Sequence, residues 1–221
     1  MPVNPRAPIE VTAYNSVPPV ARGFVKDMRV RWALEEIGLP YRVRLVGGVF
    51  GEKSAEHLAD QPFGQVPVYK EDRLTLFESG AILMYIGEKD ERLLPQNSSG
   101  RARAIAWMIA ALNSVEPTTQ MLFVVGFATQ GQEWSDSAKA AVRPFAEGRL
   151  ASLSHALGDR EWLEGQFTIG DLVMVDVLRS VSEPELVAAH PNLAAYVGRG
   201  TARPAFERAM AAHLADLVET V

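Results

Sequence analysis

The sequence predicts an α/β domain followed by an all-helical domain, and three observations support this. Apolar and polar residues alternate over residues 9–14 and again over 41–45, which is the spacing of half-buried strands. Between them, apolar residues recur at helical spacing over 30–37 until Gly38 ends the pattern. Helical spacing then dominates residues 101–221. Strand, helix and strand, followed by a hairpin and a helix, indicate a mixed sheet with helices on its faces.

The hairpin lies in residues 63–85. Val66 precedes Pro67, a polar turn occupies residues 70–73, and a second alternating run covers 74–77. Proline cannot donate a hydrogen bond to a neighbouring strand, so a strand that opens on proline leaves nearby backbone groups free for another partner.

The hairpin is followed by an apolar run for which Ser79 is the predicted N-cap. The first turn of such a helix presents unpaired N–H groups to an anion. A free strand edge and an anion site a few residues apart suit a small extended peptide that carries a carboxylate. The plainer interpretation is a hairpin running into a capped helix, with Pro67 as a rigid corner and Ser79 as a cap only.

Composition narrows the possible functions. The chain has 221 residues, of which 48% are hydrophobic and 22% charged, and its net charge of -5 argues against broad nucleic-acid binding. It contains no cysteine, which excludes disulfides, a protein dithiol and thiolate metal sites. The four histidines are not at ligand spacing, so no metal is expected. We find no signal-peptide core and no apolar run of membrane-spanning length, and therefore expect a cytoplasmic protein without membrane association.

The stretches PFGQVPVY (residues 62–69) and LFESGAI (residues 76–82) resemble the glutathione-binding half of the glutathione S-transferases. The resemblance implies a thioredoxin-like domain over residues 1–92, a linker over 93–100 and an all-helical domain over 101–221. It continues in the second half, where Thr168 and Asp171 match a family capping box whose role is in folding.

The resemblance also implies a glutathione site. In the family, the proline that matches Pro67 is cis, and the residue that matches Val66 pairs its backbone with the cysteinyl part of glutathione. The Glu78-Ser79 pair corresponds to the residues that hold the γ-glutamyl end. Lys53 corresponds to the basic residue for the glycyl carboxylate, although a solvated lysine is the alternative. The expected glutathione-binding set is Lys53, Gln65, Val66, Pro67, Glu78 and Ser79.

In this family, a hydroxyl or thiol after the first strand donates a hydrogen bond to the glutathione sulfur. Ser16 is the first candidate here and Tyr14 the second, although a turn serine and a half-buried strand tyrosine are the plainer interpretations. Arg22 could add positive charge near the sulfur or hold the loop. The segment from Ser16 to Val30 is several residues longer than is usual in the family.

Arg22, Lys26 and Arg29 are expected on one helical face, which we call the basic stripe. Such a stripe is usually solvated, but it could also attract an anionic tripeptide.

In the second half, Pro117 should kink or end the helix that contains residues 105–115. By analogy with the family, the face of this helix away from its core stripe helps to line an electrophile pocket. The residues expected there are Trp107, Ala111 and Ser114.

The leading hypothesis is a homodimeric glutathione transferase that uses glutathione as co-substrate and a small hydrophobic electrophile as partner. One alternative is a glutathione-transferase-like binding or scaffold protein without catalysis. Another is glutathione-dependent reduction of peroxides or disulfides, in which bound glutathione would be the only thiol.

Overall fold

The computed structural model describes residues 3–217, whose packing divides them into two compact units. One unit combines the chain up to Leu94 with the segment from Ala202 onward, and the other is Pro95–Thr201. The domain boundaries predicted above remain a prediction. The last helix was expected in the helical domain of residues 101–221, but it packs with the first unit.

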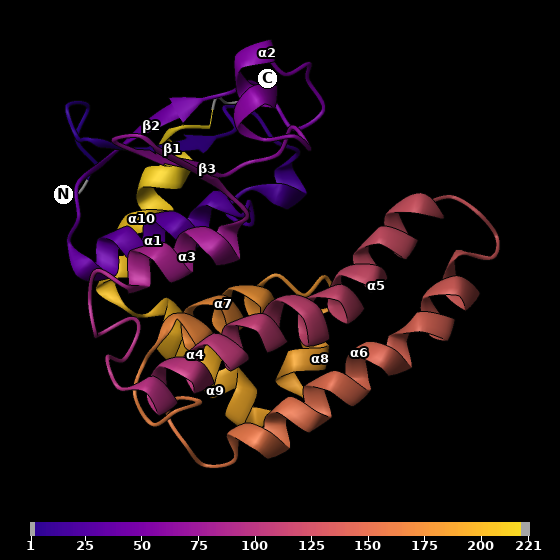
Figure 1. The fold of residues 1–221 in the computed structure, drawn as a ribbon. Helices are drawn as coiled ribbons and strands as arrows, with labels where there is room; N and C mark the ends of the chain where they lie inside the picture. The colour runs from indigo at the N-terminus through magenta and orange to yellow at the C-terminus, as the bar shows by residue number, and fades with distance from the viewer. Residues whose placement is uncertain (1–2, 218–221) are drawn as a thin grey trace. The chain divides into compact units, whose positions relative to one another are not determined.

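The first unit contains a four-stranded sheet in the order β2-β1-β3-β4. β1 pairs parallel with β2 and antiparallel with β3, and β3 pairs antiparallel with β4. α1 and α3 lie on one face of the sheet and α2 on the other, while α10 packs against α1 (Figure 1). The elements are β1 (Ile9–Ala13), η1 (Pro19–Ala21), α1 (Asp27–Ile37), β2 (Tyr41–Leu45), α2 (Ala55–Asp60), β3 (Val68–Glu71), β4 (Leu74–Phe77), α3 (Ser79–Gly87) and α10 (Pro204–Ala215).

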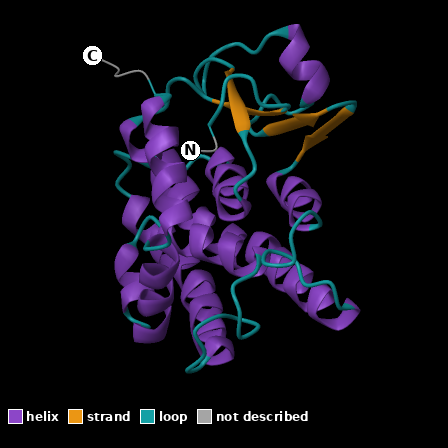
Figure 2. Ribbon diagram, turned by 90° about the vertical axis from the view of Figure 1, so that its left-hand side faces the viewer, coloured by secondary structure: helices purple, strands orange, loops and turns teal. Residues whose placement is uncertain are grey.

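This arrangement confirms the predicted fold class, a thioredoxin-like unit followed by a helical region. Figure 2 shows the strands of this sheet in orange; the other regular elements among residues 3–217 are helices. α1 ends where expected, because Gly38 adopts a left-handed conformation with φ of 73°.

Two predicted details are wrong. The basic stripe is not one solvated helical face, because α1 begins only at Asp27 and Arg29 is 1% exposed. Arg22 instead follows the short 3-10 helix η1. Ser79 is not the N-cap of α3. That position belongs to Glu78, whose φ is 68°, and Ser79 is the first helical residue.

The second unit is helical throughout its regular structure. Its elements are α4 (Ser98–Ala110), the π-helical segment η2 (Ala111–Val115), α5 (Glu116–Ala128), α6 (Ser135–Leu157), α7 (Ile169–Arg179), α8 (Pro184–Ala188) and α9 (Pro191–Thr201). After Ala110, α4 continues into the π-helical segment η2, which ends at Val115. Pro117 then lies in the first turn of α5. This fits the expected effect of Pro117, since a proline is tolerated in a first turn but interrupts the hydrogen bonding of a helix interior.

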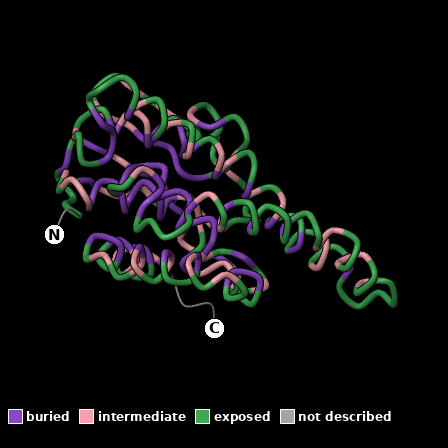
Figure 3. Tube along the Cα trace, turned by 90° about the horizontal axis from the view of Figure 1, so that it is seen from below, coloured by how far each residue is buried: buried purple, intermediate pink, exposed green. Residues whose placement is uncertain are grey.

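α7 is the core of the second unit, because every residue from Ile169 to Leu178 is buried. Gly170 allows the close approach of α4: a Cβ there would lie 2.8 Å from the Cβ of Trp107 and 3.0 Å from the Ala104 carbonyl oxygen. By contrast, the loop joining α5 to α6, at the right of Figure 3, is largely exposed.

The predicted capping box at the start of α7 is confirmed. The Thr168 N–H donates to Asp171 Oδ2 at 2.9 Å, and the Thr168 side chain accepts a bond from the first turn of the helix. The Asp171 carboxylate also accepts from the Leu163 N–H at 2.8 Å and from the Tyr196 hydroxyl at 2.9 Å. This buried carboxylate therefore joins the start of α7 to the preceding loop and to α9.

Replacing Asp171 with Asn should lower the free energy of unfolding by about 2–3 kcal/mol, because the amide leaves at least one buried donor without an acceptor. Urea denaturation monitored by circular dichroism measures this. The matched control is Asp136→Asn, at a site whose carboxylate side chain is 97% exposed, and it should unfold like the parent protein. Equal stability of both variants would show that the Asp171 bonds do not hold the unit together.

Candidate functional site

Two of the segments predicted to bind a small peptide, residues 66–67 and 78–79, adjoin the paired ends of β3 and β4 at Val68 and Phe77. The Val66-Pro67 peptide bond is cis, and both residues are buried. β3 begins at Val68, directly after this bond. The α3 N-terminus follows the same hairpin, so the Val66 backbone and the Glu78-Ser79 helix start belong to one continuous structural element.

The start of α3 has the form of an anion site. The first turn of a helix has N–H groups without intrahelical acceptors. Ser79 is buried, and its Oγ lies 3.5 Å from Nη1 of the buried Arg29. The guanidinium of Arg29 on α1 therefore lies beside the first turn of α3. The sequence did not indicate this position of Arg29, because it depends on how α1 and α3 pack.

Ser16 lies on the wall of a hollow with a volume of about 410 Å³. Its backbone forms an isolated parallel bridge with Gly48, and its carbonyl oxygen accepts from the Val49 N–H at 3.2 Å. The loop after β1 is thereby joined to the loop after β2. The hollow is lined mainly by apolar or small residues: Ser16, Val17, Pro18, Pro19, Gly48, Val49, Phe50 and Gly51.

Tyr14 has a different environment from Ser16. It is 7% exposed and packs in an apolar cluster with Val17, Val66 and Leu217. Burial raises the pKa of the Tyr14 phenol, the charge of Asp27 raises it further, and a hydrogen bond with the Val66 backbone lowers it. At neutral pH Tyr14 is therefore an uncharged phenol in contact with the same backbone that was predicted to pair with the ligand.

Lys53 connects these two candidates. Its ammonium donates to the carbonyl oxygens of Gly48 at 2.6 Å and Gly51 at 2.7 Å, and lies 5.1 Å from the centre of the Tyr14 ring. An ammonium has three donors. Lys53 can hold the loop after β2 with two of them and still present the third to a carboxylate.

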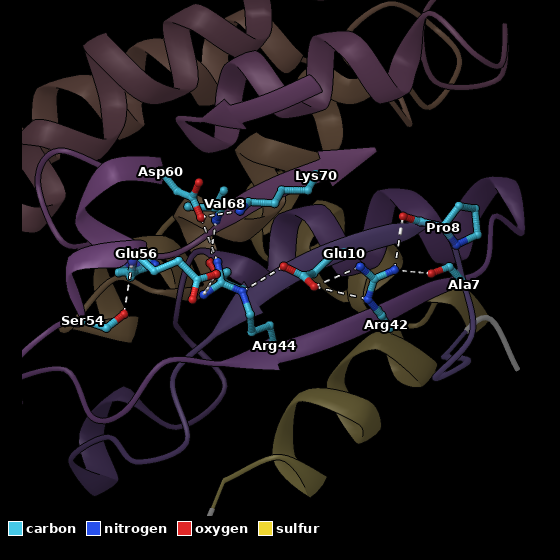
Figure 4. Close-up of polar contacts among 12 residues, drawn as sticks. Ala7, Pro8, Glu10, Arg42, Arg44, Ser54, Glu56, Asp60, Val68 and Lys70 are labelled. Carbon is cyan, nitrogen blue, oxygen red and sulfur yellow. Dashed lines mark hydrogen bonds and ion pairs between the residues drawn. The ribbon is translucent and has the colours of Figure 1, made fainter. Parts of the chain in front are cut away.

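α2 is fixed over the sheet by a ladder of charged side chains (Figure 4). Arg44 donates to Glu10 on β1 at 2.8 Å and to Asp60 on α2 at 3.0 Å, and Lys70 on β3 lies 2.6 Å from Asp60. These ion pairs bridge three strands and α2. They therefore fix the helix that lies between Lys53 and Gln65 in the chain.

His57 on α2 is a residue for which the sequence offered no partner. Its Nε2 lies 2.9 Å from the Gln65 carbonyl oxygen, so Nε2 carries the proton and donates. The ring is fully buried, and its Nδ1 has no hydrogen-bond partner among residues 3–217. His57 thus holds the backbone immediately before Val66, while the Gln65 side chain remains exposed.

The other predicted residues are less closely grouped. Arg22 is half-buried at the end of η1. In the second unit, the Trp107 indole donates to Glu164 at 3.0 Å and Ala111 is fully buried, whereas Ser114 is exposed in the π-helical segment. The electrophile pocket expected from these three residues remains a prediction. Among the described residues, no group of three His, Asp or Glu side chains could hold a metal, and no helix is both long and apolar enough to span a membrane.

Comparison with known proteins places this architecture in a family. The family description "Glutathione S-transferase, N-terminal domain" matches residues 21–88. The glutathione S-transferase GstA of Escherichia coli O157:H7 is 32% identical over 167 residues, covering 73% of this chain and 80% of that protein. Glutathione S-transferase 3 of Zea mays is 30% identical over 203 residues, with coverages of 84% and 88%. The chain belongs to the glutathione S-transferase family.

Solved structures agree with this assignment. A glutathione transferase family member from Pseudomonas fluorescens, crystallised with two glutathione bound, is 27% identical with a TM-score of 0.77 and covers 91% of this chain and 92% of that one. A theta class glutathione S-transferase from Xanthomonas axonopodis, crystallised with glutathione, is also 27% identical, with a TM-score of 0.76 and coverages of 92% and 97%. The resemblance inferred from the hairpin motifs is therefore confirmed at the level of the family.

The burial of His57 predicts a pH effect on this glutathione S-transferase. Burial lowers the pKa of the His57 imidazole, and the bond to Gln65 acts in the opposite direction. The unfolded chain therefore binds a proton near the ordinary pKa of about 6.5 that the folded chain does not bind. Stability from this group is present above that pH and is lost as the pH falls below it.

The His57→Gln variant keeps a donor for the Gln65 carbonyl but cannot titrate. Between pH 7.5 and pH 5, its free energy of unfolding in urea should fall less steeply than that of the parent protein. Identical slopes for the two proteins would show that His57 is not the group responsible.

Proposed function

We propose that this chain binds glutathione and conjugates its thiolate to small apolar electrophiles. The observation that carries the proposal is the grouping, within one unit, of the Val66 backbone beside cis-Pro67, the α3 N-terminus at Glu78-Ser79, and Ser16 on the wall of the hollow. Relatives with bound glutathione support the choice of ligand.

Each part of this site complements one part of the tripeptide. The γ-glutamyl carboxylate would lie at the first turn of α3, where helix N–H groups and nearby Arg29 favour an anion. The cysteinyl unit would pair with the Val66 backbone. The glycyl carboxylate would take the remaining donor of Lys53, whose other two donors hold Gly48 and Gly51. These contacts would leave the thiol close to the end of β1.

The chemical task is to ionise that thiol. A free thiol with a pKa near 8.5 is only a few per cent thiolate at pH 7, and lowering its pKa by about two units requires about 2.7 kcal/mol. One or two hydrogen bonds to the charged sulfur supply this much. The thiolate then forms a carbon–sulfur bond with the electrophile, while the leaving group departs or the adduct takes up a proton.

Ser16 is better placed than Tyr14 for this task. Ser16 is half-buried on the wall of the hollow, whereas Tyr14 is buried in the apolar cluster with Leu217 and Val17. The volume of the hollow, about 410 Å³, lies in the range typical of small-molecule sites. Its apolar walls favour an uncharged organic substrate.

Ser16→Ala should raise the pKa of bound glutathione by about two units and lower kcat/KM for conjugation by about 100-fold. Ultraviolet absorbance of the thiolate as a function of pH measures the first quantity, and turnover of a chromogenic aryl halide measures the second. Tyr14→Phe is the matched control and should change neither by more than about threefold. If Tyr14→Phe abolishes ionisation while Ser16→Ala does not, the roles of the two residues are reversed.

Ser79→Ala should weaken glutathione binding by about 10-fold, because a hydrogen bond to a charged group is lost at the helix start. Isothermal titration calorimetry gives the dissociation constant. Thr75→Ala, on the exposed side of β4, is the control and should bind like the parent protein. An unchanged affinity of Ser79→Ala would contradict the anion site.

A second candidate function is reduction of disulfides or peroxides by two glutathione molecules. The proteins from Pseudomonas fluorescens and Burkholderia graminis, 27% and 26% identical to this chain, were each crystallised with two glutathione molecules. Two bound thiols would reduce one disulfide to two thiols and form glutathione disulfide, with no cysteine from the protein. A calorimetric stoichiometry of two per chain, with disulfide turnover exceeding conjugation, would favour this activity.

A further inference from the structure

His213 on α10 is buried and contacts the loop that follows Ser16. The Gly23 N–H donates to its Nε2 at 3.3 Å, and its Nδ1 lies 3.1 Å from Asp27 Oδ2. A backbone N–H can only donate, so Nε2 must hold the lone pair and Nδ1 must hold the proton. His213 is therefore a neutral ring in one tautomer, oriented by Asp27 and used as an acceptor for Gly23.

Asp27 is itself held firmly. Its Oδ2 accepts from Arg31 Nε at 2.7 Å, and Arg31 donates through Nη2 to Asp216 at 2.7 Å. The side chains of Asp27 and Arg31 are fully buried. Further along the two helices, Arg208 pairs with Glu35 and Arg203 pairs with Glu36. The position of α10 on α1 is thus set by several ion pairs, and this fixes the position of His213.

The loop also fits closely against α10 at Gly23. Gly23 has φ of +84°, and a Cβ there would lie 3.2 Å from Met210 Sδ. A side chain at this position would meet both a strained backbone conformation and the α10 surface. α10 therefore holds Gly23 in two ways: one of its side chains accepts a hydrogen bond from the Gly23 N–H, and another packs closely against Gly23.

The same end of the chain contacts the beginning of the loop. Leu217, just beyond α10, is 7% exposed and packs with Tyr14, Val17 and Val66. Val17 follows Ser16 directly, and Gly23 follows Arg22 directly. The segment Met210–Leu217 thus contacts the loop at Val17, next to Ser16, and at Gly23, next to Arg22.

We propose that the segment Met210–Leu217 positions the thiol-activating loop, and that His213 is the positioning residue that fixes it at Gly23. The catalytic consequence rests on the proposed function. A displacement of about 1 Å at a reacting group can reduce the rate about 100-fold. The hydrogen bond to Gly23 therefore controls the distance between the Ser16 hydroxyl and a bound sulfur without touching the substrate.

The test compares His213→Leu with His213→Gln in the full chain. Leu cannot accept from Gly23, whereas Gln offers a carbonyl oxygen for Gly23 and an amide donor for Asp27. His213→Leu should raise amide hydrogen exchange about 10-fold or more in peptides covering residues 17–26, with no change in the β3–β4 hairpin. It should also lower kcat for conjugation about 10- to 100-fold, with a smaller change in KM for glutathione. His213→Gln should restore both quantities.

His155→Leu, at an exposed position on α6, is the matched control and should behave like the parent protein. Unchanged exchange in His213→Leu, or equal damage in His213→Leu and His213→Gln, would overturn the proposal. If His213→Leu does not fold, the parent protein decides the question by nuclear magnetic resonance. The neutral Nδ1–H tautomer of His213 is expected, and an Nε2–H or doubly protonated ring would refute the bond to Gly23.

These results separate the two proposals. A parent protein that shows the expected tautomer and exchange but no conjugation would refute the proposed transferase activity and leave the positioning contact standing. A parent protein that conjugates glutathione, with His213→Leu unchanged in exchange and rate, would refute the role of His213 and leave the activity standing.

Discussion

The first unit depends on the pairing of one buried carboxylate, Asp27. A charge without solvent is tolerated only when it is paired, and removing one partner of a buried ion pair costs about 3–5 kcal/mol. Here Oδ2 accepts from Arg31 on the same helix and from His213 on α10, while Oδ1 has no hydrogen-bond partner among residues 3–217. This requirement determines where α10 can lie on α1. It also affects the course of the loop that leads from the end of β1 to the start of α1, because that loop contacts α10 at Gly23.

The parts of the structure that the sequence predicted well are those encoded within short segments. The hairpin, the end of α1 at Gly38 and the capping box of α7 each depend on residues a few positions apart, whereas the cis form of the Val66-Pro67 bond was expected only from the resemblance to the family. Turn geometry and capping are local, so their residue types identify them. The same locality explains why the family could be inferred from two stretches of seven or eight residues. These stretches also gave the order of the predicted binding segments along the chain.

The features that were predicted wrongly or not at all depend on backbone conformation and tertiary contacts. The basic stripe was wrong because helical spacing does not reveal that α1 starts only at Asp27, or that Arg29 lies against Ser79 across a helix–helix contact. The predicted N-cap of α3 was wrong by one residue, because Glu78 adopts a positive φ that its residue type does not suggest. The contacts of His57 with Gln65 and of α10 with the first unit join residues that periodicity treats separately. Tertiary contacts of this kind leave no pattern in a single sequence.

The return of α10 to the first unit affects how the protein is made on the ribosome. Residues 95–201 take on the order of 5–20 seconds to synthesise at about 5–20 residues per second. During this interval the sheet and α1 have emerged, but Asp27 and Arg31 have not yet met His213 and Asp216. The unit encoded first is therefore the one completed last. Until then the nascent chain presents an uncovered apolar and charged face of α1, including Trp32, which later packs edge-on against Phe206.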